Sequence, residues 1–122
     1  MAAREEVLLW GLVDWVELDR IHWYVARENR AEPLSVIQNK TLDLIHSLVS
    51  EGMFTLGDLT ENCRFAAWTT PLEEAIRRIR DAYVTNFDDQ NTWPWICWLD
   101  LTERGQQVAE AIEARAATAD SG

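Results

Sequence analysis

The sequence predicts a mostly helical α+β domain. Apolar residues recur at spacings of three and four in several segments, which is the pattern of amphipathic helices. Two short segments, 53–59 and 93–101, have instead the composition and alternation of strands. A chain of 122 residues suits one compact domain. We therefore expect one domain over residues 1–116 and a frayed tail over 117–122. The expected order is three N-terminal helices, a two-stranded antiparallel hairpin with an inserted helix, and a C-terminal helix.

Three helices are expected before the first strand, over residues 4–14, 17–28 and 34–50. No Gly or Pro lies between the first two, so the sequence leaves open whether they are separate. Pro33 disfavours helical geometry in the residue before it and separates the second helix from the third. Gly52 follows the last turn of the third, where a left-handed cap favours glycine. The inward positions of the third helix are Leu34, Ile37, Thr41, Leu44 and Leu48. The apolar face is made wider by Leu42, Ile45 and Val49.

The inserted helix lies between the two strands, after a loop or extended segment over 60–68. Thr70 is the expected N-cap, Pro71 suits the first helical position, and Glu73 completes a capping box. The helix ends near Thr85. Its expected inward residues are Leu72, Ala75, Ile76, Ile79 and Tyr83, and a basic strip of Arg77, Arg78 and Arg80 faces outward. The second strand, 93–101, leads to Thr102, the predicted cap of the last helix.

Charge and cysteine content exclude several classes of protein. The chain has 21 acidic and 11 basic side chains, a net charge of −10, which opposes nonspecific binding to nucleic acid or anionic membranes. No apolar run approaches the roughly 20 residues that a membrane helix needs. The N-terminal segment does not resemble a signal peptide. The two cysteines lack zinc-ligand spacing and are expected to be reduced thiols, so a cytoplasmic protein is predicted.

Two stretches carry a resemblance to a known superfamily. The sequence LDLTERG, residues 99–105, precedes an amphipathic helix and resembles the L-T-E-x-G junction of winged-helix regulators, including the multiple-antibiotic-resistance regulator family. Residues 42–56 are similar to the third helix and first wing strand of the same superfamily. The resemblance implies a winged-helix-like fold, a regulatory or adaptor role, and a recognition helix over residues 34–50.

The charges around this recognition helix differ from those of a DNA reader. Its expected outward residues are Ser35, Gln38, Asn39, Asp43 and Ser47, with Lys40 the one basic side chain. Residues 17–50 carry four basic and five acidic groups, and residues 81–103 carry five acids and no base. Phosphate contacts normally come from Arg and Lys, so this face favours a protein partner over a duplex.

The leading hypothesis is therefore a small acidic protein-interaction module, a regulator, adaptor or neutralising (immunity-type) protein, that works as a dimer. The seven tryptophans are too many for all of them to be buried in so small a domain. The predicted partner-binding residues are Trp23, Arg77, Arg80, Asp88, Asp89 and Trp98. The arginines would dock on an acidic partner or on the Asp88–Asp89 region of a second copy.

Two alternatives remain open. A dimeric DNA-binding transcriptional regulator would use Arg27, Arg30, Ser35, Gln38, Asn39 and Lys40. A ligand- or metal-responsive sensor would use the inserted segment, but Asp81, Asp88 and Asp89 lack EF-hand spacing, so no metal site is predicted. His22 and His46 are interpreted as structural. No catalytic motif or cofactor-binding loop is present, so neither an enzyme nor a cofactor is predicted.

Overall fold

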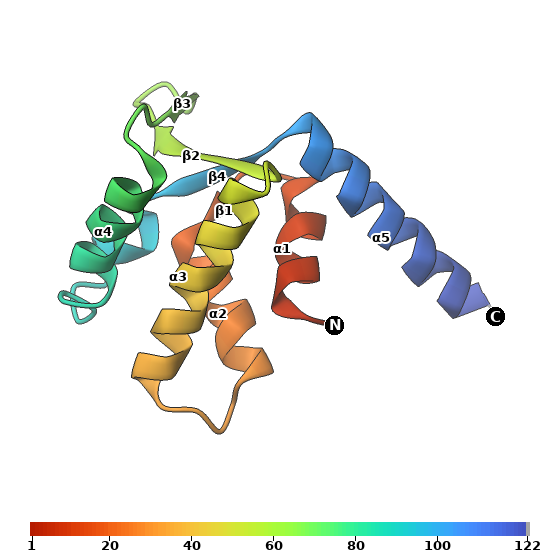
Figure 1. The fold of residues 1–122 in the computed structure, drawn as a ribbon, viewed down its shortest axis with the longest axis horizontal. Helices are drawn as coiled ribbons and strands as arrows, with labels where there is room; N and C mark the ends of the chain where they lie inside the picture. Colours follow the sequence, from red (N-terminus) through yellow and green to blue (C-terminus); the bar gives the residue numbers. More distant parts are fainter. Residues whose placement is uncertain (122) are drawn as a thin grey trace.

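The computed structural model describes residues 1–121, which form an α+β fold of helices and one antiparallel sheet (Figure 1). The expected α+β class is confirmed. In chain order the elements are α1 (Ala3–Gly11), β1 (Val16–Glu17), α2 (Leu18–Glu28), α3 (Leu34–Ser50), β2 (Phe54–Leu59), β3 (Phe65–Ala67), α4 (Leu72–Tyr83), the 3-10 helix η1 (Trp93–Trp95), β4 (Trp98–Leu101) and α5 (Glu103–Ser121).

The sheet has four strands in the order β1-β4-β2-β3, so the expectation of a two-stranded hairpin is wrong. The pairing of the two expected strands is correct, because β2 and β4 are antiparallel with Leu56 opposite Leu99. The two additional strands have two and three residues. Strands this short cannot show the alternation by which a sequence indicates a strand.

The register divides the sheet into an inner and an outer face. Val16, Leu56 and Leu99 lie in line across three strands and are buried on the inner face. The next positions, Glu17, Trp98 and Gly57, are also in line and lie on the outer face. Figure 1 shows α1, α2, α3 and α4 on the same side of the sheet. The helices therefore cover the inner face and leave the outer face without a helical layer.

The first two helices are separate. The chain leaves α1 at Gly11, forms β1 beside β4, and enters α2 at Leu18, so the first helix is shorter than the expected 4–14. The third helix has the predicted bounds, 34–50. Gly52 has φ 77°, the left-handed conformation expected after this helix.

The predicted strand over 93–101 is wrong in its first half. Residues 93–95 form η1, and only residues 98–101 form a strand. Pro94 has no N–H to donate to a sheet. Trp93 is fully buried, and its ring lies 4.8 Å from that of Phe87 and 5.1 Å from that of Tyr83, measured between centroids. Tertiary packing of Trp93 therefore decides the local conformation.

The expected capping box of α4 does not form. The N-cap residue is Pro71, and no side chain caps the helix. Glu73 instead pairs with His46 of α3 at 2.7 Å, so a tertiary contact replaces the local one. The expected inward face is confirmed, since Ala75, Ile79 and Tyr83 are buried and Leu72 and Ile76 pack against the core.

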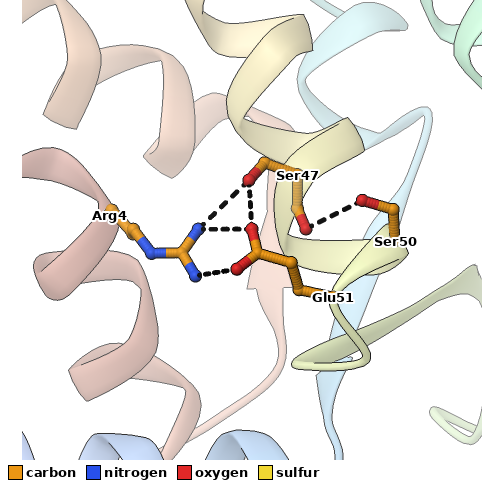
Figure 2. Close-up of polar contacts among 4 residues, drawn as sticks. All are labelled: Arg4, Ser47, Ser50 and Glu51. Carbon is orange, nitrogen blue, oxygen red and sulfur yellow. Dashed lines mark hydrogen bonds and ion pairs between the residues drawn. The ribbon is translucent and has the colours of Figure 1, made fainter.

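The N-terminal helix is fastened to the end of α3 by a polar cluster (Figure 2). The Arg4 guanidinium donates to both carboxylate oxygens of Glu51, at 3.1 and 3.3 Å, and to the Ser47 hydroxyl at 3.3 Å. Ser47 also donates to Glu51, and Ser50 donates to the Ser47 carbonyl. The bond from Ser47, and then the charge of Arg4, lower the pKa of the Glu51 carboxyl.

The last helix begins at the predicted cap. The Thr102 hydroxyl accepts a hydrogen bond from the Gly105 N–H at 3.0 Å and donates to the Gly52 carbonyl at 2.5 Å. Ala109 and Ile112 are buried as α5 leaves the sheet beside α1, and its far end projects from the body (Figure 1). The helix continues through residues 117–121, where the sequence predicts fraying, while Gly122 lies outside the described residues.

Candidate functional site

An exposed surface rich in aromatic and arginine side chains is formed where α1 meets α2. We call it the α1–α2 surface, and its residues are Trp10, Val13, Arg20, Trp23, Tyr24 and Arg27. Val13 is 72% exposed and Trp23 is 56% exposed, although both are apolar. Arg20, Trp23, Tyr24 and Arg27 stand at positions i, i+3, i+4 and i+7 of α2, so helical geometry places them on one face.

The arginines of this surface are held in place by rings and by carboxylates. The Arg20 guanidinium carbon lies 3.7 Å from the centroid of the Trp10 ring, and Arg20 Nε lies 2.8 Å from Glu17. Arg27 lies 5.4 Å from the centroid of Tyr24 and pairs with Glu6 at 3.0 Å. Stacking and pairing fix side chains that would otherwise lose conformational freedom on binding.

Two hollows open on the same surface. One, of about 310 Å³, is lined by residues that include Trp23 and Arg20, and the other, of about 530 Å³, by residues that include Trp10 and Val13. They share Arg20, Tyr24 and Arg27. The indole N–H of Trp23 donates to Asp19 at 2.9 Å, which fixes its ring at the rim. The surface thus offers depressions that side chains of another protein can enter.

A second aromatic region lies on the outer face of the sheet and contains Trp98. Its ring stacks on Trp95, with centroids 5.9 Å apart, and Trp95 is 51% exposed. Trp15 stacks on Phe65 at 6.4 Å. A Cβ atom at Gly57 would overlap the Phe65 ring, so glycine is required where that ring crosses β2 beside Trp98.

The predicted basic strip faces solvent along α4, beside α3. Arg77, Arg78 and Arg80 are exposed, as expected. Glu73 and Glu74, which lie one turn before these arginines, form no i,i+4 ion pair with them among the described residues. Arg80 instead lies 3.5 Å from Asn39 of α3, and Arg78 stacks on Trp68 at 4.3 Å from the ring centroid. Longer-range partners therefore replace local pairing.

The two acids Asp88 and Asp89 lie in the exposed turn between α4 and η1. The Asp89 carboxylate accepts the backbone N–H of Asn91 at 3.3 Å, and the Asp89 carbonyl accepts that of Thr92 at 3.1 Å. In the described part of the chain, no group of three or more His, Cys, Asp or Glu side chains is placed to hold a metal ion.

The residues of the DNA-binding alternative are only partly available. Gln38 is buried and donates to the Tyr83 carbonyl at 3.3 Å, so its expected outward position is wrong because α4 ends against it. Lys40 donates to Asn29, Arg27 is paired with Glu6, and Asn39 accepts from Arg80. Ser35 and Arg30 are exposed.

Titratable side chains are also buried in the core, namely His22, Tyr83 and Cys97. His22, on the face of α2 that contacts Trp93 of η1, is 2% exposed and is hydrogen-bonded through Nδ1 to the Tyr83 hydroxyl. Burial lowers the pKa of His22, against a smaller opposite effect of the Asp19 charge, and raises the pKa of Tyr83. Burial also raises the pKa of the Cys97 thiol. These groups are held in their neutral forms, which suits a packed core.

The six predicted partner-binding residues lie in four places: Trp23 on α2, Arg77 and Arg80 on α4, Asp88 and Asp89 in the following turn, and Trp98 on β4. Only Trp23 belongs to the α1–α2 surface. Trp10, Arg20 and Tyr24 were missed. The stripe on α2 is visible in the sequence at helical spacing, whereas the contact between Arg20 and Trp10 needs the fold.

A separate apolar cavity of about 320 Å³ lies between the end of α3, β2 and the start of α4. Its walls include the buried residues Phe54, Leu56 and Ala75, together with Val49, Trp68 and Leu72. The hydroxyl-bearing residues around it are Thr55, Thr70 and Thr102.

Comparisons with known proteins give no match: no family model, no curated protein and no solved structure is significantly similar to this chain. None of the described helices combines the length and the apolar character that crossing a membrane requires.

Proposed function

We propose that this protein is a protein-interaction module, acting as a regulator, adaptor or neutralising protein without catalysis, and that its partner-binding site is the α1–α2 surface. The observation that carries the proposal is a set of aromatic rings and arginines around two hollows. Trp23 is exposed, and the half-buried rings of Trp10 and Tyr24 stack against arginines. Trp, Tyr and Arg are the residue types that dominate binding energy at protein interfaces.

The charges of this surface also favour a protein partner. Arg20 and Arg27 are paired with Glu17 and Glu6, and Asp19 lies beside Trp23, so both signs are represented close to apolar rings. Such a mixture suits a polar rim around an apolar centre. It also suits a second copy of the same surface, because a two-fold contact sets each patch against itself.

We further propose that the scaffold is winged-helix-like. Three helices precede an antiparallel β2–β4 pair, and the Thr102 junction leads into a last helix, which agrees with the order implied by the resemblance. The segment between β2 and β4 contains β3, α4 and η1, where the superfamily has a short loop.

The position of α4 supports a protein partner over a duplex. Contacts from Glu73 to His46 and from Arg80 to Asn39 hold α4 alongside the outward side of α3. A helix with its side chains is about 10–12 Å across, and the major groove is about 12 Å wide. With α4 beside it, α3 cannot enter a groove as deeply as a lone recognition helix.

One observation favours the DNA-binding alternative. The fold brings Arg80 of α4 against Asn39 of α3, with Arg77 one turn before it, although the two helices are separate in the sequence. Phosphate contacts made from α4 would compensate for the shortage of bases on α3. The exposed acids Asp43, Asp81 and Glu74 lie on the same two helices and oppose such contacts.

The proposal is tested with a second copy as the partner. Light scattering over a range of concentrations should show a monomer–dimer equilibrium, and Trp23→Ala should raise its dissociation constant at least about tenfold, because truncating a central aromatic anchor removes packing and desolvation. Trp95→Ala is the matched control, since Trp95 is similarly exposed but belongs to η1 and lines neither hollow.

A wild-type protein that remains monomeric at millimolar concentration would remove the second copy as partner. Equal weakening by Trp23→Ala and Trp95→Ala would show that the α1–α2 surface is not the binding site.

A further inference from the structure

The cavity between α3, β2 and α4 reaches the core of the protein. Phe54, Leu56 and Ala75 are each no more than 5% exposed, yet all three contribute to its walls. A surface groove formed only by loosely packed exposed side chains would not include such residues. Its volume of about 320 Å³ lies at the lower end of the range for small-molecule sites.

Trp68, which forms one wall of the cavity, is held in place through both its backbone and its side chain. Its backbone N–H donates to the Leu56 carbonyl at 2.9 Å, which ties the β3–α4 connection to β2. The Arg78 guanidinium stacks on its ring at 4.3 Å and also lies 4.0 Å from Asp58. The indole therefore forms a pre-organised flat wall, and a flat wall favours a planar ligand.

Polar groups at this cavity are few, and two of them are available. Among residues 1–121, no hydrogen bond is recorded for the Thr70 hydroxyl or for the buried Trp68 indole N–H. Thr102 is engaged in capping α5, and the Thr55 side chain lies on the outer face of the sheet beside Asp100. No carboxylate or ammonium group belongs to the lining. Apolar walls with a few hydroxyls match an uncharged ligand that carries one hydrogen-bond acceptor.

We propose that this cavity is a binding site for small, uncharged, planar heteroaromatic molecules. The ring lies against Trp68 and the apolar walls, and one acceptor atom receives a hydrogen bond from the Thr70 hydroxyl. The site is distinct from the α1–α2 surface, with which it shares no residue, so it does not depend on the proposed partner binding.

Titration with quinoline at neutral pH tests the site, followed by the indole N–H signals in two-dimensional ¹H–¹⁵N NMR. The Trp68 signal, assigned with Trp68→Phe, should shift saturably with half-saturation at about 1 mM or below, as a ligand of about ten heavy atoms allows. The signals of Trp23 and Trp95, on other surfaces, serve as internal controls and should not saturate.

Variants then localise the binding. Ala75→Leu fills the cavity and should weaken binding at least about tenfold. If the other indole signals show that Ala75→Leu does not fold, Leu72→Phe, which narrows the mouth of the cavity, is used in its place. Thr70→Val removes one hydroxyl at an exposed position and should weaken binding about threefold to tenfold.

Three results would overturn the proposal. One is the absence of a saturable shift of Trp68. Another is the same affinity in folded Ala75→Leu or Leu72→Phe. The third is unchanged affinity in Thr70→Val, which would remove the hydrogen-bonded acceptor and leave only nonspecific apolar contact.

Discussion

At the scale of single residues, the stability of the fold depends on the buried contact between His22 and Tyr83. Both side chains are buried, their polar atoms bond to each other, and the rings of Phe87 and Trp93 surround them. A buried polar atom that loses its partner costs more than the bond itself is worth, because it has already lost its water. This pair therefore joins α2 to α4 and η1 more specifically than apolar packing alone does.

Tyr83→Phe is expected to lower the free energy of unfolding by about 1–3 kcal/mol, since the His22 nitrogen loses its partner while the ring is retained. Urea denaturation followed by circular dichroism measures the change. Tyr24→Phe, at a half-buried ring on the α1–α2 surface, should change stability by less than about 0.5 kcal/mol. Equal effects of the two variants would contradict the role of the buried pair.

His22 also predicts how stability depends on pH. Burial lowers its pKa in the folded protein below the ordinary value of 6.5. Above that value the imidazole is neutral in both states, and there is no effect. As the pH falls below it, the unfolded chain binds a proton that the folded chain excludes, so stability decreases by up to about 1.4 kcal/mol per pH unit until the folded pKa is reached.

This decrease should be visible between about pH 6.5 and 5, above the range in which ordinary carboxylates titrate. Thermal unfolding of the wild type, His22→Gln and His46→Gln across this interval measures it. His22→Gln is expected to flatten the dependence, whereas His46→Gln, which replaces an exposed side chain, should retain it. A wild-type profile that is flat over the interval would argue against a buried neutral His22.

At the scale of elements, the junction between β4 and α5 joins several parts of the fold. The Thr102 hydroxyl caps α5 and at the same time bonds to the backbone that links α3 to β2. Gly105 lies one turn later, where a Cβ atom would overlap the Met53 carbonyl, so the helix must pass very close to that backbone. The junction thus sets the direction in which α5 leaves the sheet.

Thr102→Ala is expected to lower the free energy of unfolding by about 1 kcal/mol, and by up to about 2 kcal/mol where the second bond also counts. Differential scanning calorimetry measures this loss. Thr69→Ala is the control, because the exposed Thr69 hydroxyl has no recorded hydrogen bond within the described residues, and it should leave the transition unchanged. If both variants behave alike, the cap does not stabilise this junction.

At the scale of the whole molecule, charge and shape favour the same class of partner. The chain has a net charge of −10, and its three exposed α4 arginines lie among acids of α3, α4 and the following turn. The aromatic and arginine residues of the α1–α2 surface lie on different elements from that strip. Partner binding therefore does not require the side of the molecule that a duplex would approach.

The whole-molecule prediction concerns DNA. In gel-shift experiments with a random duplex at about 50 mM salt, no complex is expected up to micromolar protein, because each acid on the α3–α4 side repels phosphate. A shift that weakens steeply with added salt and is lost in the double variant Arg77→Ala/Arg80→Ala would favour the DNA-binding alternative instead.

The sequence by itself determined the features that depend on local periodicity and capping: the bounds of α3, the inward face of α4, the Thr102 cap and the exposure of Trp23 and the α4 arginines. Only the tertiary structure decided the others. Strands of two or three residues form because a neighbouring strand offers hydrogen bonds, and Trp93 leaves the expected strand because a buried aromatic cluster accepts its ring. Gln38 is buried, and Glu73 contacts His46 where a capping contact was expected, because α3 and α4 pack together. The meeting of Trp10 with Arg20 across two helices, and the cavity between α3, β2 and α4, likewise depend on contacts that no local pattern records.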